Sequence, residues 1–193
     1  MRYNQGLEET LIKRIQTYIF LIGIAGLIVA LDQWTKQLVR ANLAFQEIWS
    51  PFEWLAPYAR IVHWRNTGAA FGLFQDGNLI FTILAFIVSG LILLYFPHIP
   101  HREGLIRLAV AMQLGGAVGN LIDRLTQGHV TDFISVGSFA VFNVADASIS
   151  VGVVILLLGV WLAERAEKAQ YKAEAELAAQ AVTAPAVENE ENG

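Results

Sequence analysis

The stretch LIFTILAFIVSGLILLYF, residues 79–96, contains no Asp, Glu, Lys, Arg or His. As a helix it is about 27 Å long, close to the roughly 30 Å hydrocarbon core of a lipid bilayer. Three further stretches share this character, at 15–31, 108–122 and 147–163. The run at 108–122 is short and must extend over Arg107 or Asp123 to cross. We therefore expect four transmembrane helices.

Composition supports a membrane protein and excludes several kinds of chemistry. The chain is 55% hydrophobic and 16% charged, with a mean hydropathy of +0.48, which is unusually apolar for a soluble domain of this size. The absence of cysteine excludes disulfides, zinc–thiolate sites and cysteine nucleophiles. With a net charge of -4, the sequence shows no basic surface of the kind that binds nucleic acid. We therefore expect no nucleic-acid partner.

The distribution of Lys and Arg predicts the orientation of the spans, because cytoplasmic loops carry the excess of these residues. With four spans, both termini and the turn at 97–106 share one side. That side carries Arg2, Lys13, Arg14, Arg102, Arg107, Arg165, Lys168 and Lys172; the other carries Lys36, Arg40, Arg60, Arg65 and Arg124. Both termini are expected in the cytoplasm, and segments 32–78 and 123–146 outside.

The outer segments have features of their own. Two β-prone runs, 130–136 and 139–142, are separated by Gly137-Ser138 and predict a short hairpin. Four tryptophans lie in the outer loop, where they either rest on the headgroup layer or pack a small subdomain: Trp34, Trp49, Trp54 and Trp64. The fold class is thus all-α, with four transmembrane helices and a small extracytoplasmic β element.

The C-terminal segment differs in composition from the rest of the chain. Beyond Glu164 the sequence becomes rich in Ala, Glu, Lys and Gln, and it ends in acidic residues. This pattern is typical of a helix that extends into water and frays to disorder. We expect a four-span domain at 1–165 and a polar, disordered cytoplasmic tail at 166–193.

Carboxylates at the edges of the apolar stretches are the candidates for chemistry. Asp32, Asp123 and Asp146 each adjoin a span, where a charge is costly unless it is paired or hydrated. Asp132 lies in the expected hairpin, and the topology brings it to the same membrane surface as Asp146. Two close carboxylates cannot both ionise cheaply, so one keeps a proton while the other acts as a base. This arrangement lets an aspartyl protease activate water.

Other hydrolytic mechanisms fit the sequence less well. It contains no His-Glu-x-x-His and no Gly-x-Ser-x-Gly, and its four histidines are scattered. A Ser-Lys dyad would have only Lys36 available near the outer surface. Asp123 is the rival of Asp132, but its neighbour Arg124 offers a salt-bridge partner, which suits a structural ion pair. We expect no metal and no organic cofactor.

Five motifs resemble the lipoprotein signal peptidase family of bacterial membrane proteases. In family order they are Asp32-Gln33-x-Thr35-Lys36, Arg65-Asn66-Thr67-Gly68-Ala69-Ala70-Phe71-Gly72, Gly115-Gly116-Ala117-Val118-Gly119-Asn120-Leu121-Ile122-Asp123-Arg124, Gly128-His129-Val130-Thr131-Asp132-Phe133 and Phe142-Asn143-Val144-Ala145-Asp146. The resemblance implies a catalytic pair at Asp132 and Asp146 and an outer β-rich cradle.

The resemblance also implies the substrate and the setting. The substrate is a diacylglyceryl-modified prolipoprotein, cut just before the lipid-modified cysteine, with membrane lipids as the other partners. The expected location is the bacterial inner membrane, with a monomer as the working unit. The departure from the pattern is the spacing of 14 between Asp132 and Asp146, which is shorter than in some relatives and trims the intervening hairpin.

Supporting residues can be assigned with alternatives. Asn120 and Asn143 orient the aspartates or bond the substrate backbone, or else they cap helix ends. By resemblance, Asn66 and Arg124 lie near the lipid-bearing part of the substrate, whereas the alternative for Asn66 is a turn. Asp32 is expected to pair with Lys36, one turn along the helix, or with a facing backbone group. The glycine-rich run at 115–119 permits close helix packing or leaves room for a substrate helix.

Two other functional classes remain open from the sequence. A transporter or proton-coupled channel also uses intramembrane acids, but it would place them in the middle of the spans, whereas these cluster at one surface. A non-catalytic scaffold would tolerate asparagine at Asp132 and Asp146. A shared-proton pair would instead give a bell-shaped pH dependence of cleavage.

Overall fold

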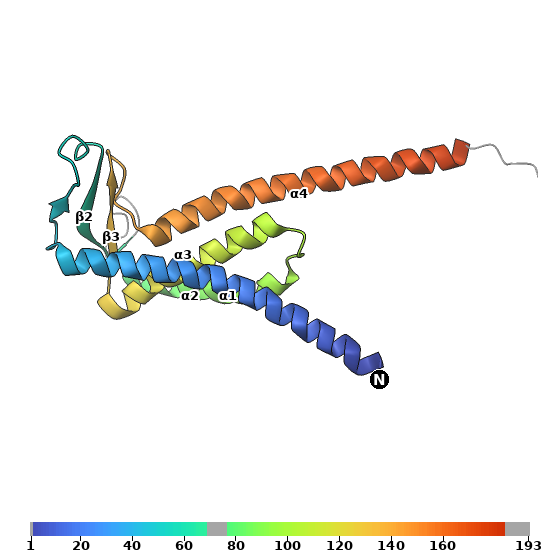
Figure 1. Ribbon diagram of the computed structural model, residues 1–193, viewed down its shortest axis with the longest axis horizontal. Coiled ribbons are helices and arrows are strands. Elements are labelled where there is room, and N and C mark those ends of the chain that lie inside the picture. Colours follow the sequence, from blue (N-terminus) through green and yellow to red (C-terminus); the bar gives the residue numbers. More distant parts are fainter. Residues whose placement is uncertain (1, 69–76, 184–193) are drawn as a thin grey trace, which may run out of the picture.

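The computed structural model describes residues 2–68 and 77–183, and within these ranges long helices carry a small sheet at one end (Figure 1). The helices are α1 (Arg2–Asn42), α2 (Asn78–Tyr95), α3 (Gly104–Gln127) and α4 (Val144–Thr183), with a 3-10 turn η2 (Phe96–His98). The strands are β1 (Ile48–Trp49), β2 (Ala59–Asn66) and β3 (Val130–Val136).

All four predicted transmembrane helices are present. The segments long and apolar enough to cross a membrane are Leu11–Asn42, Asn78–His98, Gly104–Gln127 and Val144–Leu177. The third reaches the required length by extending over both Arg107 and Asp123. The prediction of an all-helical multi-pass membrane protein with a small β element is confirmed.

Helix α3 is the centre of the bundle. In its most apolar stretch 56% of the residues are buried, against 11% to 22% in the other three spans. Glycines on α3 allow the close contacts: a Cβ at Gly116 would lie 2.5 Å from the carbonyl oxygen of Ala145 on α4, and a Cβ at Gly115 would lie 2.8 Å from the Cβ of Ile28 on α1. The small residues therefore serve helix packing, as the sequence predicted.

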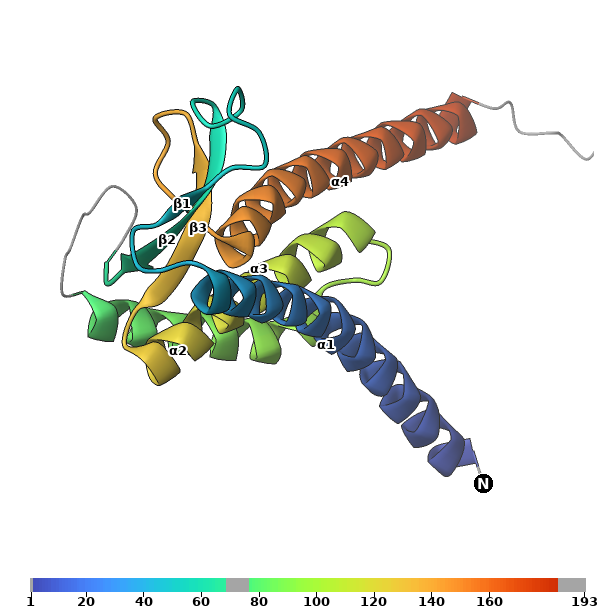
Figure 2. The same cartoon turned by 60° about the vertical axis from the view of Figure 1, so that its left-hand side comes forward.

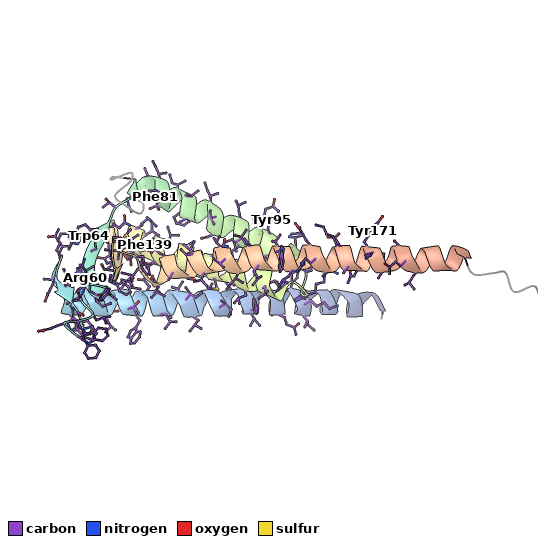
Figure 3. All side chains as sticks on the ribbon, turned by 90° about the horizontal axis from the view of Figure 1, so that it is seen from above. Arg60, Trp64, Phe81, Tyr95, Phe139 and Tyr171 are labelled. Atoms are coloured by element: carbon purple, nitrogen blue, oxygen red, sulfur yellow. The ribbon has the colours of Figure 1, made fainter. Side chains whose placement is uncertain are left out.

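The helices separate with distance from the sheet. Figure 2 shows α1 and α4 diverging as they leave the β strands, and in Figure 3 Tyr171 lies on α4 far beyond the other labelled residues. Large apolar side chains such as Leu27 on α1 and Leu157 on α4 are exposed along these spans. Such a surface needs an apolar solvent, which a bilayer supplies.

The sheet forms differently from the predicted hairpin. Its order is β1-β2-β3 and its pairings are antiparallel, so β3 has β2 as its ladder partner. The predicted return run at 139–142 contributes only an isolated bridge between Phe142 and Ile134. The hairpin prediction was thus wrong in extent, because α4 begins at Val144 and leaves the return run too short.

The four tryptophans of the outer loop are all surface residues. Trp34, Trp49, Trp54 and Trp64 are between 42% and 69% exposed. Side chains this exposed do not form the core of a subdomain. The structure therefore favours the membrane-interface interpretation of these residues.

Helix α4 continues past the expected domain boundary. Residues 166–183 remain helical, so this part of the segment predicted as a disordered tail is helix, and from Glu164 to Leu177 the residues are exposed. A sequence rich in Ala, Glu and Lys has high helix propensity, which supports such an extension in water. The division into 1–165 and 166–193 stays a prediction, and 184–193 lie outside the described residues.

Candidate active site

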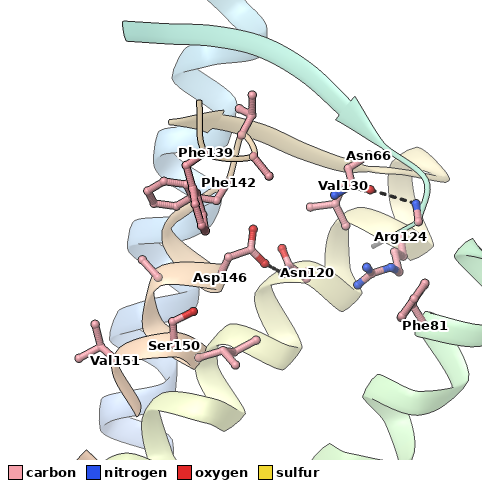
Figure 4. A pocket seen from close by; sticks show the side chains of 15 residues that line it. Asn66, Phe81, Asn120, Arg124, Val130, Phe139, Phe142, Asp146, Ser150 and Val151 are labelled. Atoms are coloured by element: carbon pink, nitrogen blue, oxygen red, sulfur yellow. Dashed lines mark hydrogen bonds between the residues drawn. The ribbon is translucent and has the colours of Figure 1, made fainter. Parts of the chain in front are cut away.

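Two carboxylates meet at the end of the bundle that carries the sheet. Asp132 lies in the middle of β3, and Asp146 lies in the first turn of α4. Asp146 lines a cavity of 470 Å³ whose wall is largely apolar, with Phe142 and Val151 among the lining residues (Figure 4). Asp132 is only 1% exposed and accepts a hydrogen bond from Asn66, which also lines the cavity.

Asn143 connects the two carboxylates. Its side-chain Nδ2 donates to Asp132 Oδ1 at 2.7 Å, and its backbone N–H donates to Asp146 Oδ2 at 3.2 Å. In return, the backbone N–H of Asp146 donates to Asn143 Oδ1 at 2.9 Å. The last two bonds form a reciprocal cap at the start of α4. Capping and carboxylate orientation, two of the predicted roles of Asn143, are therefore performed by the same side chain.

Two more asparagines complete the set of donors. Asn66 Nδ2 donates to Asp132 Oδ2 at 2.9 Å, and Asn120 Nδ2 donates to Asp146 Oδ1 at 2.8 Å. The bond from Asn120 to Asp146 is drawn as a dashed line in Figure 4. Every oxygen of the two carboxylates thus accepts a hydrogen bond from a neutral amide.

The orientation of each side-chain amide is fixed by a group that can only donate. The carbonyl oxygen of Asn66 accepts from the backbone N–H of Gly68 at 3.0 Å, and that of Asn120 accepts from Lys36 Nζ at 2.9 Å. The carbonyl oxygen of Asn143 accepts from the N–H of Asp146. Because an N–H or ammonium cannot accept, each amide must turn its oxygen to that group and its NH₂ to a carboxylate.

Burial and a neighbouring charge raise the pKa of one carboxyl group of the pair. Desolvation by burial, followed by the nearby charge of Asp146, raises the pKa of Asp132 to about 7. Asp146 lies at a helix N-terminus, where the backbone dipole favours a negative charge. One group can therefore hold a proton near neutral pH while the other is ionised, as general acid–base chemistry requires.

A second carboxylate pair, Asp32 and Asp123, lies beside the first and carries its own cations. Lys36 Nζ is 2.8 Å from Asp32 and 3.4 Å from Asp123, and Arg40 Nη1 is 3.4 Å from Asp123. Asp32, Lys36 and Asp123 are each 0% exposed. The predicted pairing of Asp32 with Lys36 is confirmed.

The predicted ion pair between Asp123 and Arg124 was wrong. Consecutive residues on a helix point in different directions, so Asp123 faces α1 and pairs with Lys36 and Arg40 instead. Its Oδ2 also accepts the backbone N–H of Thr131 at 2.8 Å, which anchors the start of β3. Arg124 turns toward the cavity, with its guanidinium 5.5 Å from the ring of Phe81 (Figure 4).

Lys36 lacks the surroundings of a Ser-Lys dyad. Within the described ranges its contacts are with Asp32, Asp123 and Asn120, none of which is a serine. In the same ranges, no group of three or more His, Asp or Glu side chains is placed to hold a metal ion. Residues Ala69–Gly72 of the second motif lie outside the part of the chain that the structure describes.

Several residues that contribute to the site were not predicted from the sequence. Gln33 Nε2 lies within hydrogen-bonding distance of Asp32, Asp123 and the carbonyl oxygen of Gly119, and Arg40 Nη1 donates to Thr131 Oγ1 at 3.0 Å. A signal existed for Arg40, because positions 32, 36 and 40 recur every four residues and share one helix face. No local signal pointed to the ring of Phe81 beside Arg124, since that contact joins α2 to α3.

At one end of this helical membrane bundle, two carboxylates accept hydrogen bonds from amide groups. These are the groups that a membrane aspartyl peptidase needs. Residues 24–162 match the family model described as signal peptidase (SPase) II, and the chain belongs to this family.

Similar curated proteins are lipoprotein signal peptidases. That of Moorella thermoacetica is 38% identical over 133 residues, covering 69% of this chain and 87% of the relative. That of Brevibacillus brevis is 39% identical over 142 residues, covering 72% and 93%. A solved structure described as a bacterial membrane enzyme, determined by the in meso method at 2.3 Å resolution, matches with a TM-score of 0.67 and 28% identity, covering 73% of this chain and 87% of that one.

Proposed function

We propose that this chain is an aspartyl endopeptidase that removes the signal peptide from diacylglyceryl-modified prolipoproteins, cutting before the lipid-modified cysteine. The observation that carries the proposal is the pair Asp132 and Asp146, joined by Asn143 beside an apolar cavity at one end of a membrane bundle. Membership of the signal peptidase II family and the names of the similar proteins support the substrate class.

The positions of the two carboxyl groups relative to the cavity suggest a role for each. Asp146 lines the cavity at a helix N-terminus, so in this proposal it is the ionised base that takes a proton from water. The resulting hydroxide oxygen bonds to the scissile carbonyl carbon, and protonated Asp132 gives its proton to the carbonyl oxygen. The proton taken by Asp146 then passes to the amide nitrogen as the C–N bond breaks, and one hydroxyl proton of the diol returns to Asp132. The products are a carboxylic acid and a free amine, and both carboxyl groups regain their starting protonation.

The surroundings of the pair support binding of a membrane-embedded substrate. The cavity combines an apolar wall with Arg124 and the donors Asn66 and Asn120. A signal helix can lie against the apolar wall while the bond to be cut meets the polar groups. We assign Arg124 and Asn66 to the lipid-bearing part of the substrate, and Asn120 and Asn143 to orientation of the aspartates. Asp32 and Asp123 support the site through the ion-paired cluster.

The direct test is cleavage of a purified diacylglyceryl-modified prolipoprotein by the protein in detergent, with the new N-terminus identified by mass spectrometry. The expected product begins at the lipid-modified cysteine. The matched control is the same precursor without the lipid, which should be cut more slowly because it lacks the group assigned to Arg124. Absence of cleavage of the lipidated precursor would favour the transporter or scaffold interpretation instead.

The setting is part of the same proposal: the bacterial inner membrane, cytoplasmic termini and a monomer among membrane lipids. Because the chain has no cysteine, single cysteines can report the orientation. Ser138→Cys near the sheet should react with an impermeant maleimide in intact spheroplasts, whereas Glu174→Cys on α4 should react only after the membrane is opened. The opposite pattern would reverse the orientation, and cross-linking that captures two copies of the chain would contradict the monomer.

A further inference from the structure

Lys36 has a position that ion pairing alone does not explain. It is 0% exposed, on α1, and its ammonium donates to Asn120 Oδ1 at 2.9 Å in addition to its contacts with two carboxylates. Lys36 is not among the residues that line the cavity. It can therefore affect bound substrate only through another side chain.

The chain of contacts from Lys36 ends at the cavity. Lys36 holds the oxygen of the Asn120 amide, and the NH₂ of the same amide donates to Asp146 Oδ1 at 2.8 Å. A second donor, Asn143 Nδ2, reaches Asn120 Oδ1 at 3.1 Å, but it also bonds Asp132 at 2.7 Å and lies 3.4 Å from the carbonyl of Thr131. Two hydrogens shared among three acceptors fix Asn120 less firmly than an ammonium does.

We propose that Lys36 is a positioning residue for the peptidase reaction, which holds the Asn120 amide in the orientation that donates to Asp146. The inference rests on the proposed function and adds a residue on α1 to its machinery. If the Asn120 amide flipped, its oxygen and its NH₂ would exchange places. The Asn120 oxygen would then face Asp146 Oδ1, so that two hydrogen-bond acceptors would lie at a distance suited to a donor and an acceptor. The base would then lose a donor and gain a repulsive contact.

The charges around Lys36 allow this role to be separated from charge balance. Lys36 faces Asp32 on its own helix and Asp123 on α3, and Asp123 is also paired with Arg40. Replacing Lys36 alone leaves Asp32 buried without its cation, which can prevent folding. Replacing Asp32 and Lys36 together removes one charge of each sign and leaves the pair of Asp123 with Arg40 in place. The asparagine of Asp32→Asn can still accept the N–H of Ala145 that Asp32 now accepts at 3.0 Å.

The experiment compares kcat and KM for wild type, Lys36→Met and the double variant Asp32→Asn/Lys36→Met, each normalised to folded protein. We expect kcat to fall about 10- to 100-fold in both variants, because each loses the donor that secures a hydrogen bond to a charged group. KM should change little, because Lys36 does not line the cavity. Lys168→Met, at an exposed position on α4, is the matched control and should keep wild-type kinetics.

The pH profile supplies a second readout, which reports the charge of Lys36 at the carboxylate pair. The positive charge of Lys36 lowers the pKa of Asp132, so Lys36→Met should shift the alkaline limb of the kcat/KM profile to higher pH. A double variant with wild-type kcat would show that Lys36 only balances Asp32 and would overturn the inference. An active wild type with an unchanged profile in Lys36→Met would overturn it as well. A wild type that cleaves no lipidated precursor would overturn the proposed function first, and the inference with it.

Discussion

The same end of the bundle holds two pairs of carboxylates in opposite ways. Asp32 and Asp123 contact the cations Lys36 and Arg40, whereas Asp132 and Asp146 are held by the neutral amides of Asn66, Asn120 and Asn143. A buried carboxylate with a cation keeps its charge and serves as a fixed link between elements. A buried carboxylate whose hydrogen-bond partners are only neutral amides is protonated more easily. The difference separates the structural acids from those that can do chemistry.

The largest effect on activity is expected from Asp132 and Asp146, the pair that accepts hydrogen bonds from amides. Asp132→Asn and Asp146→Asn should each lower kcat by about 10²- to 10⁴-fold, the usual contribution of a general acid or base. Folding should persist, because asparagine has nearly the same shape and removes a buried charge. Kinetics on lipidated precursor and thermal unfolding in detergent measure the two properties. Full activity in either folded variant would return Asp123 to candidacy.

The ion-paired cluster should respond in stability. Asp123→Asn breaks contacts with Lys36 and Arg40, and loss of one partner of a buried ion pair typically costs about 3–5 kcal/mol. The free energy of unfolding in mixed detergent micelles measures this cost. A variant as stable as the wild type would show that the cluster is not a structural link.

Close packing of α3 against the cluster predicts a smaller loss. A Cβ at Gly119 would lie 2.7 Å from Asp32 Oδ2, and overpacking of this kind typically costs about 1–3 kcal/mol. Gly119→Ala should therefore unfold at lower temperature. Gly90→Ala is the matched control, because nothing lies within 4 Å of a Cβ there, and it should not be destabilised.

The raised pKa of Asp132 predicts how stability and activity depend on pH. In the folded protein burial raises it from 3.8 to about 7, so between these values the native state retains a proton that the unfolded chain releases. The contribution of Asp132 to the free energy of unfolding is fully present below about pH 4. It is lost as the pH rises to 7, by at most about 1.4 kcal/mol per pH unit. Asp132→Asn should flatten this slope. Activity that needs protonated Asp132 should likewise decline above pH 7, and a profile rising through pH 8 would contradict its role as the acid.

The smallest effect is expected far from both pairs. Lys168 and Glu164 form an exposed ion pair of 3.8 Å on α4, and such pairs contribute about 0–1 kcal/mol. Lys168→Met should leave unfolding and cleavage within error of the wild type. A large change would mean that the α4 extension takes part in the fold of the site.

The sequence predicted the four spans well because each depends on a local run of apolar residues. The hairpin was predicted poorly because the main partner of β3 is β2, and pairing of Ala59 with Val136 joins residues far apart in the chain. The pairing of Asp32 with Lys36 followed from helical spacing, whereas the pairing of Asp123 with α1 required knowledge of helix packing. The amide orientations could not be predicted, because each depends on a donor from another turn or helix.

The assignment of chemistry to Asp132 and Asp146 stays a prediction, although the structure brings the two together through Asn143. The most direct test is the cleavage rate per folded molecule for Asp132→Asn and Asp123→Asn, measured side by side on one lipidated precursor. We predict that Asp132→Asn lowers this rate by about 10²- to 10⁴-fold, while Asp123→Asn retains most of it in the fraction that folds. The reverse order would contradict the separation of the two pairs and would make Asp123 the partner of Asp146.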